Sequence, residues 1–345
     1  MRRWILACVV CVVCVSTLLA QISLDVSLVT LVATVSDRSG RSVPDLGTSD
    51  FIVLEDGKEQ NISLVEQSTA LPLSIGILLD ASYSMEPKIH TATAAIDRFL
   101  ESLGPTDDIF MMSFAAKPKV EQNFTGDRKK ISKALHKVKL GNRTALYDTI
   151  EQGIQKIRDG KHEKKALLLV TDGQDTVSRI RLDQAMRDVR ESHVLLYCLG
   201  IGADFNSRLG GPPMLRLPGG ILIPMPGTSR QQFPSGAGGG TGAGRYPGSA
   251  PPYAGPETAD MRVLNMLASA SGAKAWLVTS GSANSRSIDE VLDEVGAELR
   301  SQYTIGYYPN HPVNDGKWHQ VVVRTKNSSY EVRSRKEYYG GQPGR

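Results

Sequence analysis

Short apolar runs alternate with segments of helical periodicity through the middle of the chain. The runs LSIGILL, DIFMMSF, ALLLV and VLLYCLG are continuous, which is typical of strands buried on both faces. Between them, apolar residues recur at helical spacing, for example over 89–103 and 146–157. This alternation predicts an α/β domain over residues 71–302, with a doubly wound, mostly parallel sheet and helices on both faces.

The two flanks of this domain have a different pattern, rich in β-branched and aromatic residues. Residues 21–70 contain VSLVTLVATVSD and a predicted hairpin about Asp56-Gly57. Residues 303–345 contain WHQVVVRTK and a predicted turn at Asn314-Asp315-Gly316. Because both flanks have the pattern of strands, we expect them to pack together as one small β-rich unit beside the α/β domain.

The composition changes abruptly after Gly202. Residues 203–257 contain 13 glycines and 10 prolines among 55 residues. This share is well above that of a folded domain. We therefore predict that 203–257 is a mobile insertion in the α/β domain.

The first twenty residues, MRRWILACVVCVVCVSTLLA, combine a basic start with a long apolar run. This is the pattern of a secretory signal peptide, although the same run could also remain as a short uncleaved anchor. Three of the four cysteines lie in it, so only Cys198, in an apolar run, would remain after cleavage. We predict a secreted, periplasmic or cell-envelope protein without an intrachain disulfide, in contact with the membrane only if the segment stays uncleaved.

Polar residues follow the predicted strands where a parallel sheet binds its ligands. In GILLDASYSMEPK, Asp80, Ser82 and Ser84 stand at alternate positions directly after a buried strand. Thr144 precedes a predicted helix and Asp172 follows another strand, so all five belong at the carboxyl edge of the sheet. Taken singly, each also fits a plainer role as a helix cap or a turn. Taken together, their oxygens suit a hard divalent cation.

At these five positions the chain resembles the von Willebrand factor type A (VWA) family, over about residues 71–302. The metal-ion-dependent adhesion site (MIDAS) of that family has the form Asp-x-Ser-x-Ser with a distant Thr and Asp. The resemblance implies a Rossmann-like fold in which Asp80, Ser82, Ser84, Thr144 and Asp172 hold Mg²⁺, with Mn²⁺ or Ca²⁺ as alternatives. It also implies that an exposed Asp or Glu of a partner protein fills the open coordination position.

The flanks resemble a narrower group, the bacterial VWFA-related proteins, which are mostly exported. The segments that carry this resemblance are LVTLVATVSDRSGRSVPDLGTSDFIVLEDGKEQNI and SQYTIGYYPNHPVNDGKWHQVVVRTKNSSYEVRSRKEYYG. With them, the resemblance spans nearly all of the chain that would remain after cleavage.

Two other functions compete with metal-dependent protein binding. A metal-dependent hydrolase is one, since Mg²⁺ beside Ser and Asp can assist phosphoryl transfer. The sequence disfavours it, because GKS, GKT, HExxH and GxSxG are absent and the six histidines show no ligand spacing. The other is a structural scaffold with a vestigial metal site. We therefore expect a non-enzymatic binding protein. Without Arg2 and Arg3, the chain has 38 basic and 36 acidic residues, and this near balance gives no reason to expect a nucleic-acid partner.

Overall fold

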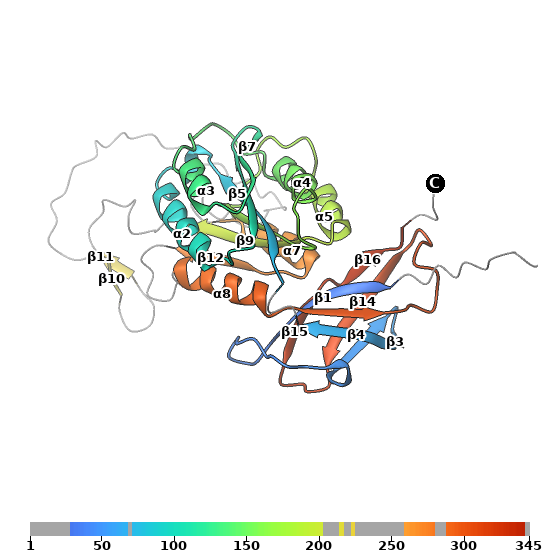
Figure 1. Cartoon of the computed structure of the whole chain (residues 1–345). Coiled ribbons are helices and arrows are strands. Elements are labelled where there is room, and N and C mark those ends of the chain that lie inside the picture. Colours follow the sequence, from blue (N-terminus) through green and yellow to red (C-terminus); the bar gives the residue numbers. More distant parts are fainter. Residues whose placement is uncertain are drawn as a thin grey trace, which may run out of the picture.

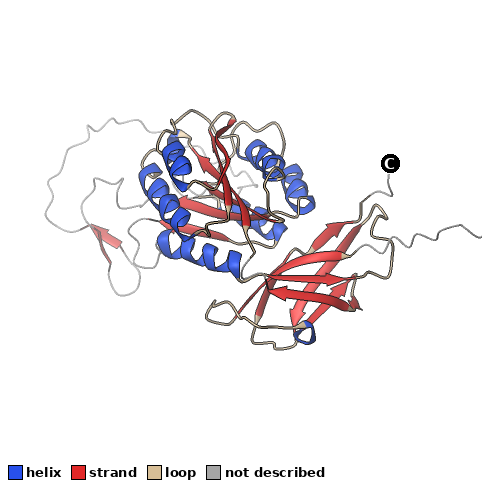
Figure 2. Cartoon of the chain, in the orientation of Figure 1, coloured by secondary structure: helices blue, strands red, loops and turns tan. Residues whose placement is uncertain are grey.

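The computed structural model describes residues 28–67, 71–202, 214–216, 222–224, 259–279 and 288–341. Figures 1 and 2 show an α/β domain in the upper part of the view and a β-rich unit below it. The predicted signal segment 1–20 lies outside the described residues. So does the predicted insertion 203–257, except for the paired short strands β10 (Met214–Arg216) and β11 (Leu222–Pro224).

A six-stranded sheet forms the centre of the α/β domain, in the order β12-β9-β8-β5-β6-β7. Its parallel strands are β5 (Leu73–Asp80), β6 (Asp108–Phe114), β8 (Lys164–Thr171), β9 (Leu195–Gly202) and β12 (Ala275–Thr279). All residues of β5, β6 and β9 are buried, which is why these segments are mostly apolar. The prediction of a mostly parallel sheet is therefore confirmed.

The edge strand β7 (Pro118–Thr125) pairs antiparallel with β6. Sequence analysis did not identify it, because its residues are half-buried or exposed and form no apolar run. An edge strand needs only one neighbour, so it lacks the pattern that marks the strands at the centre of the sheet.

Helices cover both faces of the sheet (Figure 1). One face is covered by α2 (Ile89–Ser102), α3 (Arg128–Leu135) and α8 (Ile288–Arg300), and the other by α4 (Leu146–Ile157), α5 (Leu182–Glu191) and α7 (Met261–Ser271). Each helix buries an apolar stripe, such as Ala92, Ile96 and Phe99 of α2. The result is the predicted doubly wound layer arrangement. None of the helices in the described part of the chain is long and apolar enough to cross a membrane.

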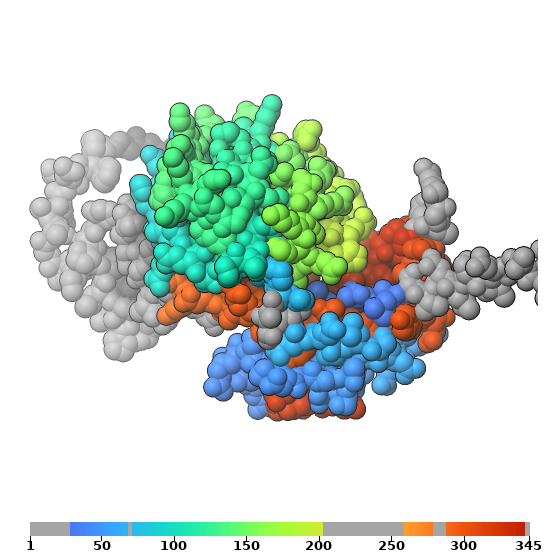
Figure 3. Space-filling model, viewed as in Figure 1, coloured from blue at the N-terminus to red at the C-terminus, as the bar shows by residue number. Residues whose placement is uncertain are grey.

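The β-rich unit is built from both ends of the chain, as expected. Blue and red atoms lie together in the lower lobe of Figure 3. From the amino-terminal flank come β1 (Val29–Ser36), η1 (Thr48–Asp50), β2 (Phe51–Glu55), β3 (Lys58–Gln60) and β4 (Ile62–Gln67). From the carboxyl-terminal flank come β13 (Tyr303–Tyr307), β14 (Trp318–Thr325), β15 (Glu331–Ser334) and β16 (Glu337–Tyr339).

Two antiparallel sheets, β15-β1-β13-β4 and β16-β14-β2-β3, each combine strands of both flanks. The strands of the two flanks alternate in the first sheet, and in the second they meet where β14 pairs with β2. Apolar residues from both flanks share one core, among them Leu31, Val53 and Ile305. The predicted hairpin about Asp56-Gly57 is confirmed, since both residues have positive φ and β2 pairs with β3 across them. Because each sheet needs strands from both ends, neither flank can complete its core alone.

Candidate functional site

The five predicted site residues all lie at the carboxyl edge of the sheet, at the end of a strand or in a loop. Asp80 is the last residue of β5, and Asp172 directly follows β8, its parallel neighbour. Ser82 and Ser84 belong to the loop after β5, where η2 (Tyr83–Met85) forms one short turn. Thr144 precedes α4 by two positions. Parallel strands end at the same edge of a sheet, so these residues gather there.

Asp80 is the most buried acid of the site, with 0% exposure. The Ser82 backbone N–H donates to its Oδ1 at 2.8 Å, and the Thr171 hydroxyl donates to its Oδ2 at 2.6 Å. Burial raises the pKa of Asp80 to about 6. The negative charge of nearby Asp172 also raises this pKa, while the hydrogen bonds from Thr171 and Ser82 lower it. A buried carboxylate in this state gains from a nearby cation.

Backbone hydrogen bonds join the loop after β5 to the loop that carries Thr144. The Tyr83 N–H donates to the Gly141 carbonyl at 3.0 Å, and the Gly141 N–H donates to the Ala81 carbonyl at 2.8 Å. The Ser82 and Ser84 hydroxyls lie 2.9 Å apart, so they face the same space. The loop of Thr144 is fixed in turn by its N–H, which donates to the Thr176 hydroxyl at 2.8 Å.

Asp172 has one oxygen that the described residues leave unsatisfied. The Gln174 N–H donates weakly to Oδ1 at 3.4 Å, while Oδ2 is buried without a hydrogen-bond partner. The ammonium of Lys88 lies 3.9 Å from Oδ2, and the Lys88 residue is only 6% exposed. Unsatisfied buried carboxylate oxygens are costly, so Oδ2 is positioned for a cation.

Lys88 is the residue of this site that sequence analysis missed. It stands just before α2, where a lysine is normally solvated, and only its burial shows that it belongs to the site. Its charge offsets part of the negative charge of Asp172. The signal in the sequence is weak, because spacing alone does not reveal which lysine side chain points inward.

The donor set fits a hard divalent cation. Two carboxylates and three hydroxyls offer oxygen ligands only, and Asp172 Oδ2 accepts no hydrogen bond.

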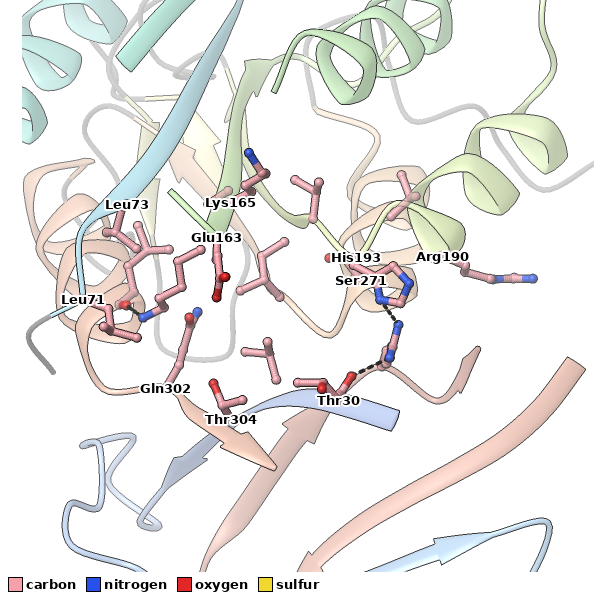
Figure 4. Close-up of a pocket in the computed structure, with 18 of the residues that line it drawn as sticks. Thr30, Leu71, Leu73, Glu163, Lys165, Arg190, His193, Ser271, Gln302 and Thr304 are labelled. Carbon is pink, nitrogen blue, oxygen red and sulfur yellow. Dashed lines mark hydrogen bonds between the residues drawn. The ribbon is translucent and has the colours of Figure 1, made fainter. Parts of the chain in front are cut away.

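A second feature, a cavity of about 340 Å³, lies at the opposite edge of the sheet, where β5, β8 and β9 begin. Figure 4 shows Lys165 and Glu163 on its α/β side, and Thr30 and Thr304 on the side of the β-rich unit.

This cavity lies between the α/β domain and the β-rich unit. Arg335 of the β-rich segment contacts His193 Nδ1 and donates to the Thr30 carbonyl at 2.6 Å. Burial and the charge of Arg335 lower the pKa of His193 to about 4, so His193 is neutral at physiological pH. These polar groups are already paired with each other, so we assign the cavity a structural role.

Residues 74–210 match the model of the von Willebrand factor type A domain. The chain is similar to the conserved hypothetical protein BatB from Bacteroides thetaiotaomicron at 15% identity, with a TM-score of 0.44, covering 66% of this chain and 100% of that one. It is similar to a von Willebrand factor type A protein from Catenulispora acidiphila at 13% identity, with a TM-score of 0.47, covering 85% of this chain and 73% of that one.

A third similar structure is proximal thread matrix protein 1 from the mussel byssus, determined with a zinc-occupied MIDAS motif. Its identity is 18% and its TM-score 0.36, and the match covers 40% of this chain and 38% of that one. No curated protein matches the chain.

Proposed function

We propose that this chain, whose residues 74–210 match the model of the von Willebrand factor type A domain, binds a partner protein through a divalent ion at the carboxyl edge of its sheet. VWA domains generally mediate protein–protein interaction, and most are not enzymes. The observation that carries the proposal is the position of Asp80, Ser82, Ser84, Thr144 and Asp172 at one edge of the sheet, with a buried Asp172 oxygen that accepts no hydrogen bond.

The proposed ion is Mg²⁺, with Mn²⁺ or Ca²⁺ as alternatives, because the donors are oxygens. When bound, the ion would present positive charge to an exposed Asp or Glu of the partner. The chain's own part is to hold the ligands in place: Asp80 through Ser82 and Thr171, and the loop of Thr144 through Thr176. We further propose export to the secreted or cell-envelope space, from the apolar pattern of residues 1–20.

Calorimetric titration of Mg²⁺ into the metal-free protein tests the proposal. We expect one saturable site in the parent and at least a hundredfold loss of affinity in Asp80→Ala, because a central carboxylate is removed. Asp183→Ala is the matched control, since this α5 carboxylate is 64% exposed and lies outside the site. Binding of equal strength in Asp80→Ala would contradict the proposal. Pull-downs with the parent and with Asp80→Ala, each in Mg²⁺ and in EDTA, then search for the acidic partner. The partner should be retained only by the parent in Mg²⁺.

A scaffold with a metal site that no longer binds is the second candidate, and Lys88 favours it. Its buried ammonium, 3.9 Å from Asp172 Oδ2, already provides a positive charge at the site. If the ammonium competes with the ion, Lys88→Met is expected to bind Mg²⁺ at least tenfold more tightly than the parent. Lys129→Met, an exposed lysine of α3, serves as the control. A parent that binds no Mg²⁺ beside a Lys88→Met variant that does would establish the scaffold function.

A further inference from the structure

Two histidines and a glutamate meet inside the β-rich unit, apart from the site described above. Glu55, His311 and His319, here called the histidine cluster, each offer a ligand atom, and these atoms lie within 4.8 Å of one another. Glu55 ends β2 and His319 lies in β14, while His311 lies in the loop between β13 and β14. The cluster therefore joins the two ends of the chain.

Glu55 is 2% exposed, and only one of its oxygens is satisfied within the described residues. Oε1 accepts from the hydroxyl of Tyr307 at 3.1 Å and from that of Tyr338. Oε2 is buried and has no hydrogen-bond partner. A carboxylate oxygen taken out of water in this way costs free energy unless a further donor or a cation reaches it.

His311 also presents an unsatisfied atom to the cluster. Its Nδ1 lies 2.9 Å from the Pro312 carbonyl oxygen. Because a carbonyl only accepts, Nδ1 holds the proton, and the neutral ring has its lone pair on Nε2. Nε2 is buried without a hydrogen-bond partner, 3.4 Å from Glu55 Oε1. When the ring is neutral, its Nε2 lone pair faces a carboxylate oxygen at this distance, and a cation between the two atoms would satisfy both.

His319 is oriented by a carboxylate on its far side. Its Nδ1 lies 2.9 Å from Asp56 Oδ2, an arrangement that is typical of histidines that bind a metal through the other nitrogen. Nε2 lies 3.1 Å from Asp315 Oδ1. The rings of His311 and His319 stack with centroids 4.0 Å apart at an angle of 14°, so the two imidazoles lie side by side.

Two separations within the histidine cluster and Asp315 are close to the edge of a tetrahedral site. Ligand bonds of about 2.0–2.1 Å place neighbouring donor atoms about 3.3 Å apart. The pair formed by Glu55 and His311 is at 3.4 Å, and the pair formed by His319 and Asp315 is at 3.1 Å. The charges agree as well, because the carboxylates of Glu55, Asp56 and Asp315 surround two imidazoles.

We propose that Glu55, His311 and His319 bind one transition-metal ion of the Zn²⁺ class, with Asp315 within reach as a fourth ligand. Imidazole nitrogens favour such ions over Mg²⁺ and Ca²⁺, so the site is chemically distinct from the all-oxygen set at the sheet edge. The ion would link β2 to β14 and to the loop before it. It would act as a structural clamp that holds the two ends of the chain together.

Zn²⁺ binding, measured by competition with a chromophoric chelator, tests this proposal in the full chain without a polyhistidine tag. Asp80→Ala is the parent for the experiment, so that Zn²⁺ at the sheet edge does not contribute. We expect one tight Zn²⁺ that excess Mg²⁺ does not displace and that raises the melting temperature. His311→Gln and Glu55→Gln, each added to Asp80→Ala, are expected to weaken binding at least tenfold. His136→Gln, an exposed histidine beside Asp97, should leave it unchanged.

Thermal melting in EDTA shows whether each variant is folded without metal. If His311→Gln fails to fold, Glu55→Gln still tests the proposal, because its amide oxygen can accept from the Tyr307 and Tyr338 hydroxyls as Glu55 does. Absence of a tight Zn²⁺ in Asp80→Ala would overturn the proposal, and His319 would then be an imidazolium held between Asp56 and Asp315. Equal Zn²⁺ affinity in Asp80→Ala and in both added variants would overturn it too. Co²⁺ absorption adds a direct readout, since a tetrahedral nitrogen and oxygen site gives intense d–d bands that these variants should lose.

Discussion

Replacing Asp80 by asparagine is expected to stabilise the metal-free protein at neutral pH and to remove its affinity for Mg²⁺. Burial raises the pKa of the folded-state carboxyl from 3.8 to about 6, so the folded chain binds the proton more tightly than the unfolded chain. The stability that this proton provides is complete below pH 3.8 and is lost as the pH rises through 6. Asparagine mimics the protonated form, so we expect a gain of about 1–3 kcal/mol above pH 6.

The neighbours of Asp80 can accommodate this change. The Ser82 N–H still donates to an amide oxygen, and the amide nitrogen donates to the Thr171 hydroxyl oxygen, which now accepts. Urea unfolding in EDTA from pH 4 to pH 8, for the parent and Asp80→Asn, measures the effect. The two free energies of unfolding should converge near pH 4 and separate by pH 7, with Asp183→Asn following the parent. Parallel curves would show that Asp80 is not destabilising when ionised.

Replacing Glu298 by alanine is expected to cost about 3–5 kcal/mol of unfolding free energy. This glutamate of α8 is 4% exposed and joins the two parts of the chain. Its Oε1 accepts from the Tyr197 hydroxyl at 3.0 Å and from the Thr34 hydroxyl at 3.4 Å, while Oε2 pairs with Arg333 at 2.5 Å. Alanine leaves a largely buried guanidinium and a buried phenol without their acceptor, which is more costly than the loss of one hydrogen bond.

Urea unfolding followed by circular dichroism checks the size of this loss. Asp293→Ala is the matched control, because it removes an exposed carboxylate from the same helix. Limited proteolysis adds a local readout, since Thr34 lies in β1 and Arg333 in β15, and both strands should become easier to cleave. A loss below about 1 kcal/mol would mean that water replaces the carboxylate at the junction.

The α/β domain could be predicted closely because its signals are local. A strand buried on both faces must be apolar over most of its length, as β5 and β9 are, and a helix on the sheet must be apolar at helical spacing, as α4 is. β7 fails this rule because an edge strand has one side in solvent. The pattern also assigned Cys198 to the core, where it is buried and where burial raises the pKa of its thiol.

The sequence by itself determined the alternation of buried strands and helices in the α/β domain. It also placed Asp80, Ser82, Ser84 and Asp172 after strands that share one sheet edge, and Thr144 before a helix at that edge. These features follow from periodicity and from the direction of parallel strands. Only the tertiary structure decided that β1 lies between β13 and β15, that Lys88 points inward beside Asp172, and that His311 and His319 meet Glu55. Such contacts join residues far apart in the chain, and they depend on strand register and side-chain direction, which local patterns do not specify.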